Sequence, residues 1–205
     1  MSQRRPGTPG TPKGLARRHA LLDHAARILV EHGHAALTVR SVATAAGISL
    51  GNLQYYFRTR ADLVAALLDR HLSAASDRIS APLSPPADPH AAIDMLLAEQ
   101  CDRDIATLFY ELWAMAAHDP AVAQAVRGFY DRYLTAVAEL ISTVVPNVPA
   151  STAHAQARVF VGLLEGVSLL RSGLIADADD RSDALVRRLA GALLTEDSRR
   201  HDGGI

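Results

Sequence analysis

The feature that most constrains the fold of this chain is a series of apolar stripes with helical spacing, separated by helix-capping and helix-breaking residues. In the segment 15–33, Leu22, Ala25 and Leu29 fall on one face, and Gly33 ends the pattern. No stretch shows the sustained alternation of apolar and polar residues that marks a half-buried strand. We therefore predict an all-α protein of about nine helices.

A proline-rich break divides the sequence into two regions. The segment 80–89, SAPLSPPADP, interrupts the helical pattern and separates an N-terminal region (15–80) from a C-terminal region (81–205). Residues 1–14 contain no core-forming side chains and are expected to form a flexible basic arm. The C-terminal region is expected to hold a helical bundle, with helices near 89–102, 103–118, 120–145, 150–173 and 182–195. Their start signals include Asp88-Pro89, Asp119-Pro120 and the capping residue Ser182.

Two short helical segments flank the glycine at position 47. Thr38 is the expected cap of a helix over 39–46, and Ser49 caps a second helix that runs to about Phe57. Gly47 can adopt the left-handed conformation that a tight turn between two helices requires. One helical segment precedes this pair, and a longer one, which opens at the capping-box pattern Thr59-Arg-Ala-Asp62, follows it. The first three segments predict a three-helix head with a helix-turn-helix, and the fourth predicts a linking helix.

The apolar residues of the motif predict which side of it is buried: Val39, Val42, Ala43, Ala46, Ile48, Leu53 and Phe57. The opposite side of the second segment then points outward, with Leu50, Gly51, Asn52, Gln54 and Tyr55. Amide side chains can pair with base edges, and glycine lets the backbone approach a groove closely. Donors suited to phosphate oxygens are carried by Ser49, Tyr55, Tyr56 and Arg60. This side is therefore predicted to contact the major groove of DNA.

Charge is distributed unevenly, although the formal net charge is only −1. Residues 1–80 hold 11 Lys and Arg against 5 Asp and Glu, whereas residues 81–205 hold 10 against 17. A basic end on an acidic body is expected when only that end meets phosphate. A nucleoid or architectural DNA-binding protein, the alternative, would be basic throughout. An affinity that depends on salt but ignores DNA sequence would favour that alternative.

Residues 38–63 carry a resemblance to the TetR family of transcriptional regulators. The stretch TVRSVATAAGISLGNLQYYFRTRADL follows the family signature in register, at the end of the chain where the family has it. The resemblance implies that the DNA backbone is held by Thr38, Ser49, Tyr55, Tyr56 and Arg60, and that the bases face Leu50, Gly51, Asn52 and Gln54. Arg40 is counted among the DNA contacts as well. Gln54 stands where many members have Tyr, which alters base preference, and Arg60 stands where most have Lys, which keeps the charge.

The resemblance also implies the rest of the function. Residues 15–80 would form the DNA-binding domain with its linking helix, and residues 81–205 the ligand-binding and dimerisation domain. The protein is then expected to be a homodimeric repressor that a small-molecule effector releases from a palindromic operator on double-stranded DNA. The two late helices, 150–173 and 182–195, would form the dimer interface. Gly162 and Gly166 could let those helices cross closely, with packing inside one chain as the alternative.

Candidate effector-binding residues come from the aromatic side chains. Seven of the ten aromatic residues lie between positions 109 and 160. Rows of this kind usually mean core packing, but regulators of this family bind ligands inside this bundle, in mostly apolar pockets. The predicted lining residues are Phe109, Trp113, Tyr130 and Phe160. Glu111, His118 and Glu165 are candidate polar anchors, each with a surface or capping role as the alternative.

Other classes of function are disfavoured. No phosphate-binding loop, nucleophile elbow or paired-carboxylate arrangement is present, so we expect neither an enzyme nor a cofactor. His32 and His34 straddle a helix end without further ligands, so no metal site is expected. The single Cys101 is interpreted as inert and cannot form an intramolecular disulfide. No segment is apolar enough to span a membrane, and the protein is expected in the cytoplasm.

Overall fold

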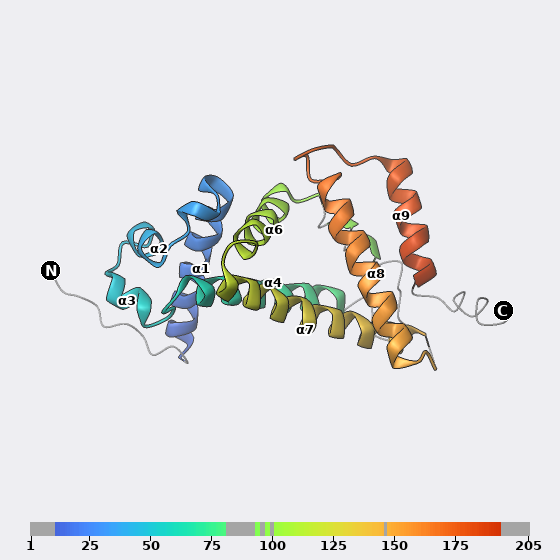
Figure 1. Cartoon of the computed structure of the whole chain (residues 1–205), viewed down its shortest axis with the longest axis horizontal. Coiled ribbons are helices and arrows are strands. Elements are labelled where there is room, and N and C mark those ends of the chain that lie inside the picture. Colours follow the sequence, from blue (N-terminus) through green and yellow to red (C-terminus); the bar gives the residue numbers. More distant parts are fainter. Residues whose placement is uncertain (1–10, 81–92, 95–96, 99–100, 146, 194–205) are drawn as a thin grey trace. The chain divides into compact units, whose positions relative to one another are not determined.

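The structure, a computed structural model, describes residues 11–80, 93–94, 97–98, 101–145 and 147–193 (Figure 1). These residues form α-helices joined by short connections, and the described part contains no strand, only an isolated bridge between Ser172 and Asp177. The prediction of an all-α fold is confirmed. The helices are α1 (Pro12–His32), α2 (Val39–Ala45), α3 (Leu50–Gln54), α4 (Arg60–Ser80), α6 (Arg103–Ala116), α7 (Pro120–Val144), α8 (Ala150–Leu169) and α9 (Asp180–Leu193), with a 3-10 turn η1 (His34–Ala36).

The first helix begins earlier than the apolar stripe indicated. The hydroxyl of Thr11 accepts a hydrogen bond from Gly14 N at 3.2 Å, and Pro12 occupies the first helical position, where its missing N–H costs nothing. Residues 12–14, expected in the arm, are therefore the first turn of α1. The remainder of the predicted arm, residues 1–10, lies outside the described residues.

The chain packs into two compact units. The head unit combines the chain up to His71 with Thr107–Phe129, and the body unit combines Leu72–Ala106 with the chain from Tyr130 onward. The long helices α4 and α7 contribute to both units. The predicted functional boundary between residues 80 and 81 stays a prediction.

The head unit has a leucine-rich core around α1, α2, α3 and the start of α4. Helix α2 packs against both α1 and α3. Side chains with no measurable exposure come from all four helices and from the loop before α2: Leu21, Leu22, Leu29, Leu37, Val42, Leu53, Leu63 and Val64. Helices α2 and α3 are too short to persist alone, so their stability comes from burial in this shared core.

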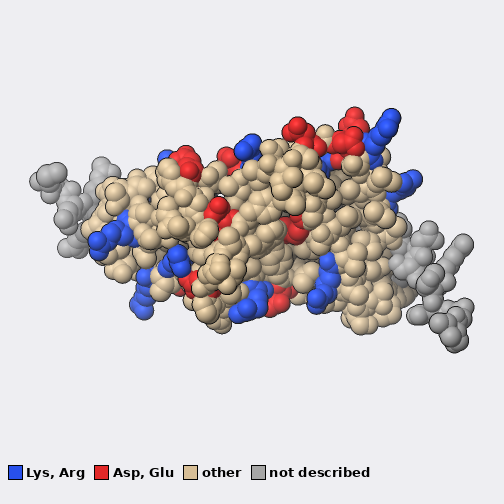
Figure 2. Space-filling model, turned by 45° about the horizontal axis from the view of Figure 1, so that its top comes forward, with Lys and Arg blue, Asp and Glu red and all other residues tan. Residues whose placement is uncertain are grey.

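Charged side chains are interspersed over the face of the molecule that Figure 2 shows. Lys and Arg stand singly or in small groups beside Asp and Glu, on a surface that is largely uncharged. On the visible face, contact with an anionic partner therefore depends on individually placed side chains.

None of the described helices is long and apolar enough to cross a membrane.

The body unit contains a second core, which forms where α7, α8 and α9 meet. The buried residues of this core include Ile141, Ala157, Phe160, Leu164 and Ala190. Ile93 and Leu97 join it from the segment before α6. Of the helix predicted near 89–102, the structure describes residues 93–94 and 97–98, which are helical, and 101–102, which are not; its predicted start at Asp88-Pro89 lies outside the described residues.

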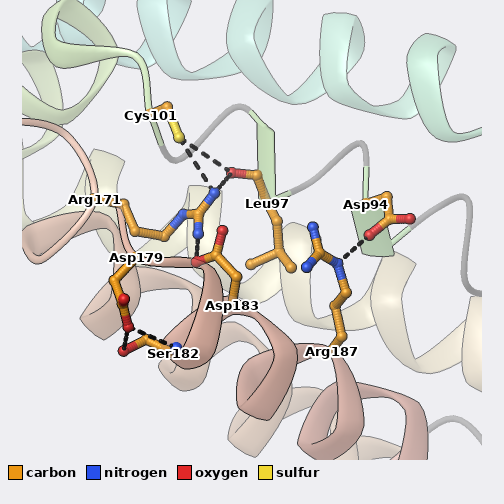
Figure 3. A network of polar contacts seen from close by, with 8 residues as sticks. All are labelled: Asp94, Leu97, Cys101, Arg171, Asp179, Ser182, Asp183 and Arg187. Carbon is orange, nitrogen blue, oxygen red and sulfur yellow. Dashed lines mark hydrogen bonds and ion pairs between the residues drawn. The ribbon is translucent and has the colours of Figure 1, made fainter. Parts of the chain in front are cut away.

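A polar network ties the connection between α8 and α9 to the segment before α6 (Figure 3). Arg171 and Asp183 form a buried ion pair, and Arg171 Nη2 donates to the carbonyl oxygen of Leu97 at 3.3 Å. On the surface, Arg187 Nε pairs with Asp94 Oδ1 at 2.5 Å. Cys101, which is exposed, lies with its Sγ 3.2 Å from Arg171 Nη2. The network therefore fixes α9 against a segment about 90 residues earlier in the chain.

Two predicted helix ends in the body unit are wrong. Helix α8 ends at Leu169 rather than near 173. Helix α9 begins at Asp180, and its cap is Asp179 rather than Ser182, because the Asp179 carboxylate accepts from Ser182 N at 2.8 Å. The bonds from Ser182 hold the pKa of Asp179 below its usual range. The cap of α9 is thus an aspartate that lies three residues before the predicted serine.

Candidate nucleic-acid interface

The turn between α2 and α3 has the predicted geometry. Gly47 has φ +63°, in the left-handed region that side-chain-bearing residues avoid. Its N–H donates to the carbonyl of Thr44 at 3.1 Å, and Ile48 N donates to Ala43 O at 3.0 Å. These two bonds close the end of α2 and turn the chain into α3. The helix-turn-helix is therefore confirmed as a structural element.

Helix α3 is shorter than predicted. It ends at Gln54, and the chain then tightens because Tyr56 N donates to Leu53 O at 2.8 Å, an i to i+3 bond. Phe57 N still bonds to the same carbonyl at 3.0 Å, so the segment remains compact. Leu53 and Phe57 are buried as predicted, and the Arg18 guanidinium lies over the Phe57 ring, 5.2 Å from its centroid.

The predicted base-facing residues share the outer side of α3. Gly51 and Gln54 are exposed, half of the surface of Tyr55 is exposed, and Leu50 and Asn52 are half-buried. A Cβ added at Gly51 would meet no atom of the described residues within 4 Å, so its backbone is open to a partner there. The Tyr55 and Tyr56 rings pack edge to face, with centroids 5.4 Å apart, which limits the freedom of both. No part of the chain among the described residues covers this side at Gly51.

Two predicted phosphate ligands also act as helix caps. The Thr38 hydroxyl accepts from Ser41 N at 2.9 Å and donates to the Ser41 hydroxyl. The Ser49 hydroxyl accepts from Asn52 N at 3.2 Å. Both predicted caps are confirmed, and Thr38 and Ser49 are exposed, as is Arg40 on α2. Their contact with DNA stays a prediction.

Arg60, the first residue of α4, has a partner that the sequence did not indicate. Its Nη2 donates to Asp119 Oδ2 in an ion pair that is partly exposed. Asp119 also caps α7, as predicted, because its Oδ1 accepts from the backbone N–H groups of Ala121 and Val122. The hydrogen bond from Arg60 is the main reason why the pKa of Asp119 lies below its ordinary value. The capping box at the start of α4 is confirmed as well, since Thr59 and Asp62 exchange hydrogen bonds.

The predicted effector-binding residues are divided between the two units. Phe109 and Trp113 lie in the head unit, with ring centroids 6.3 Å apart, and Phe109 also packs against Phe129 and His71. Tyr130 and Phe160 lie in the body unit, where Phe160 is almost wholly buried in the core. Phe109 is therefore part of an aromatic cluster in its own unit. Binding of a ligand by any of these residues stays a prediction.

The three candidate anchors differ in their surroundings. Glu165 is half-buried and accepts from the Tyr130 hydroxyl at 2.8 Å; burial raises its pKa, against the opposing effect of that bond. Glu111 binds His34 in the head unit, accepting from both its backbone N and its ring at 2.6 Å. His118 is exposed. Among the described residues no cluster of three or more His, Cys, Asp or Glu could hold a metal ion.

Two family models match this chain. A model described as "Bacterial regulatory proteins, tetR family" matches residues 21–67, which contain α2 and α3. A second, "BetI-type transcriptional repressor, C-terminal", matches residues 87–195. Together they cover the helix-turn-helix and nearly all of the C-terminal region.

Similar proteins extend over most of the chain. The HTH-type transcriptional repressor LfrR of Mycolicibacterium smegmatis is 31% identical, covering 87% of this chain and 90% of its own. An uncharacterized HTH-type transcriptional regulator in the dhlA 5'region of Xanthobacter autotrophicus is 29% identical, covering 84% and 88%. Among solved structures, the multidrug binding protein EbrR complexed with imidazole is 26% identical, with a TM-score of 0.65, covering 94% of this chain and 98% of its own.

Proposed function

We propose that this chain, which belongs to the TetR family of bacterial transcriptional regulators, represses transcription as a homodimer on a palindromic operator until a small-molecule effector releases it. The family is one of regulators rather than enzymes. The repressor LfrR, similar over most of both chains, supports repression as the direction of control.

The observation that carries the proposal is the open outer side of α3. Leu53 and Phe57 anchor the segment in the core, and Gly47 sets its angle to α2. The side that remains offers the amide of Gln54, the hydroxyl of Tyr55 and an unobstructed backbone at Gly51. An α-helix fits the major groove, where an amide can bond to a base edge and a hydroxyl to phosphate.

An exposed apolar face on α8 and α9 supports the dimer. Val159 on α8 and Leu185 and Leu189 on α9 are each at least half exposed. Added Cβ atoms at Gly162 and Gly166 would meet no atom of the described residues within 4 Å, so these glycines do not serve packing within that part of the chain. A second copy of the chain, related by a two-fold axis, is the occupant we propose for this face. Two recognition helices would then read the two halves of one palindrome.

The dimer face can be tested by oligomeric state. Leu185→Glu with Leu189→Glu should convert the dimer to a monomer in light scattering, because charges would be buried in the interface. Leu15→Glu is the matched control, since Leu15 is a similarly exposed apolar residue on α1. A double variant that stays dimeric would refute this face.

Effector binding is proposed for the body unit around Tyr130 and Glu165. A half-buried carboxylate beside an aromatic hydroxyl offers a polar anchor in apolar surroundings. The similar protein EbrR is described as a multidrug binding protein, which supports a small organic effector. Compounds that raise the melting temperature of the free protein should release it from the operator, because they favour the form that does not bind DNA. A compound that stabilises the protein and leaves operator affinity unchanged contradicts induction.

The test of the main proposal starts from a random pool of DNA duplexes. The wild-type protein should select one palindromic sequence, which then serves as the operator probe. Tyr55→Ala should weaken binding to that probe by about tenfold or more, because a hydrogen bond from its hydroxyl to a charged phosphate is worth about 1.5–3 kcal/mol. Selection of no preferred sequence would favour a non-specific DNA-binding protein instead.

A further inference from the structure

We propose that Asp119 is a positioning residue for DNA binding: its carboxylate holds the guanidinium of Arg60 in place for a phosphate oxygen of the operator. The inference rests on the proposed function, because it takes Arg60 as a phosphate-binding residue. Asp119 comes from the turn between α6 and α7, 59 residues after Arg60 in the sequence.

The carboxylate of Asp119 is held from two sides. Its Oδ1 accepts from Ala121 N at 3.0 Å and from Val122 N at 3.3 Å, which ties it to the first turn of α7. Its backbone N–H donates to Met115 O at 3.0 Å, at the end of α6. The remaining oxygen, Oδ2, accepts from Arg60 Nη2. A carboxylate fixed in this way offers Arg60 a rigid partner.

The contact leaves most of the Arg60 guanidinium available. Arginine carries five N–H donors in a planar fork, and Asp119 engages it through one nitrogen only. The Arg60 side chain is 35% exposed, so its other donors can reach a phosphate while the ion pair persists. The backbone donors before α4 are occupied, because Arg58 N and Thr59 N both donate to Asp62 Oδ2.

Positioning of Arg60 favours binding because a free arginine loses rotamer freedom when it contacts DNA. A side chain already held in one geometry has less freedom to lose, which raises affinity without a new contact. The hydrogen bond from Arg60 also holds the pKa of Asp119 below its usual range. The carboxylate is consequently ionised near neutral pH.

Within the head unit, a second contact fixes α6 against the loop that follows α1. Glu111 Oε2 on α6 accepts from His34 N and lies 2.6 Å from His34 Nδ1. The close approach uses Gly33, which has φ +75° and where an added Cβ would lie 3.4 Å from Glu111 Oε2. Glu111 on α6 and Asp119 in the α6–α7 turn thus attach this part of the head unit to residues 34 and 60. Asp119 is held at a set position relative to Arg60.

Asp119→Ser tests the proposal, because serine caps a helix well but is too short to reach Arg60. Binding is measured on the duplex that the wild-type protein selects from a random pool. Arg60→Ala should weaken binding about five- to twentyfold and lower the slope of log affinity against log salt by about one. Asp119→Ser should weaken it about three- to tenfold and lower the slope in the same direction. In the Arg60→Ala background, Asp119→Ser should have no further effect.

Two further variants separate positioning from simpler causes. Glu31→Gln removes one negative charge from an exposed site on α1 that does not contact Arg60, and it should leave affinity within about twofold. Asp119→Asn keeps a capping oxygen and should weaken binding, as Asp119→Ser does, with an unchanged melting temperature.

The positioning role is overturned if either Asp119 variant binds as tightly as wild type while Arg60→Ala binds more weakly. An equal loss from Asp119→Ser in the Arg60→Ala background also overturns it. Unchanged binding by Arg60→Ala would instead show that the phosphate contact itself is wrong, and the positioning role would fall with it.

Discussion

In the head unit, the capping bonds of the segment proposed to face DNA join neighbours in sequence, whereas the charged contacts of the body unit join distant residues. Thr38 bonds to Ser41, Ser49 to Asn52 and Thr59 to Asp62, each three residues apart. In the body unit, Arg171 reaches back 74 residues to Leu97 and Arg187 reaches back 93 residues to Asp94.

The difference fits the two tasks proposed for the units. Local caps and a glycine turn specify where α2 and α3 begin and end, while the core shared with α1 and α4 stabilises them, and a recognition element must keep one shape. Long-range contacts close large loops, so their loss affects how whole elements sit together.

The largest expected effect comes from Asp183→Ala in the body unit. The substitution leaves Arg171 buried without its ionic partner, and breaking a buried pair costs about 3–5 kcal/mol. Arg187→Ala is the control, because it breaks an exposed pair worth about 0–1 kcal/mol. Urea unfolding measures both. If the two variants lose equal stability, the buried pair does not hold α9 as described.

The next largest effect is expected in the head unit, from Gly47→Ala. An added Cβ meets no atom within 4 Å, so the cost is the left-handed conformation alone, about 1–2 kcal/mol. The free energy of unfolding, measured with urea, should fall by this amount. Operator affinity should fall as well, because the turn sets the angle of α3. A variant as stable as wild type would mean that the turn tolerates another geometry.

Gly51→Ala separates stability from recognition in the same motif. Gly51 lies within α3 with open space around its Cα, so alanine should stabilise the helix by about 0.5–1 kcal/mol. Operator affinity should nevertheless fall, because the added methyl lies on the side proposed to enter the groove. Tighter operator binding by this variant would contradict the docking of α3.

The smallest effect is a pH dependence in the body unit. Burial raises the pKa of Glu165 above the ordinary value of 4.5, so the folded state binds its proton more tightly than the unfolded state. Stability from this group is therefore lost as the pH rises from about 4.5 through the folded-state pKa. Glu165→Gln should remove that loss, so its melting temperature relative to wild type should be higher at pH 7.5 than at pH 4.5.

The control for this pH dependence is Tyr130→Phe. The Tyr130 hydroxyl stabilises the ionised carboxylate, so its removal should enlarge the pH-dependent loss of stability. A constant difference between Glu165→Gln and wild type across this pH range would show that Glu165 titrates normally.

The same contrast of local and distant contacts decides what the sequence could predict. The caps at Thr38, Ser49 and Asp119, the turn at Gly47 and the burial of Leu53 and Phe57 all follow from residues within a few positions of one another. Each of these predictions is confirmed. The early start of α1 was missed because its cap, Thr11, precedes the apolar stripe.

The missed contacts are those between distant residues. The pairing of Arg60 with Asp119, of Glu111 with His34 and of Arg171 with Asp183 depends on how helices pack, and no spacing in the sequence indicates it. Asp119 was predicted as a cap and Arg60 as a phosphate ligand, each from local pattern alone. Their contact appears only once α4 and the α6–α7 turn are brought together in the head unit.

Hydrogen exchange with and without the selected operator tests most directly that the outer side of α3 binds DNA. Backbone amides of residues 49–57 should become protected at saturating operator, together with those at the start of α4, while amides of α8 and α9 stay unchanged. Unchanged exchange over residues 49–57, with the protein fully bound, would contradict the account.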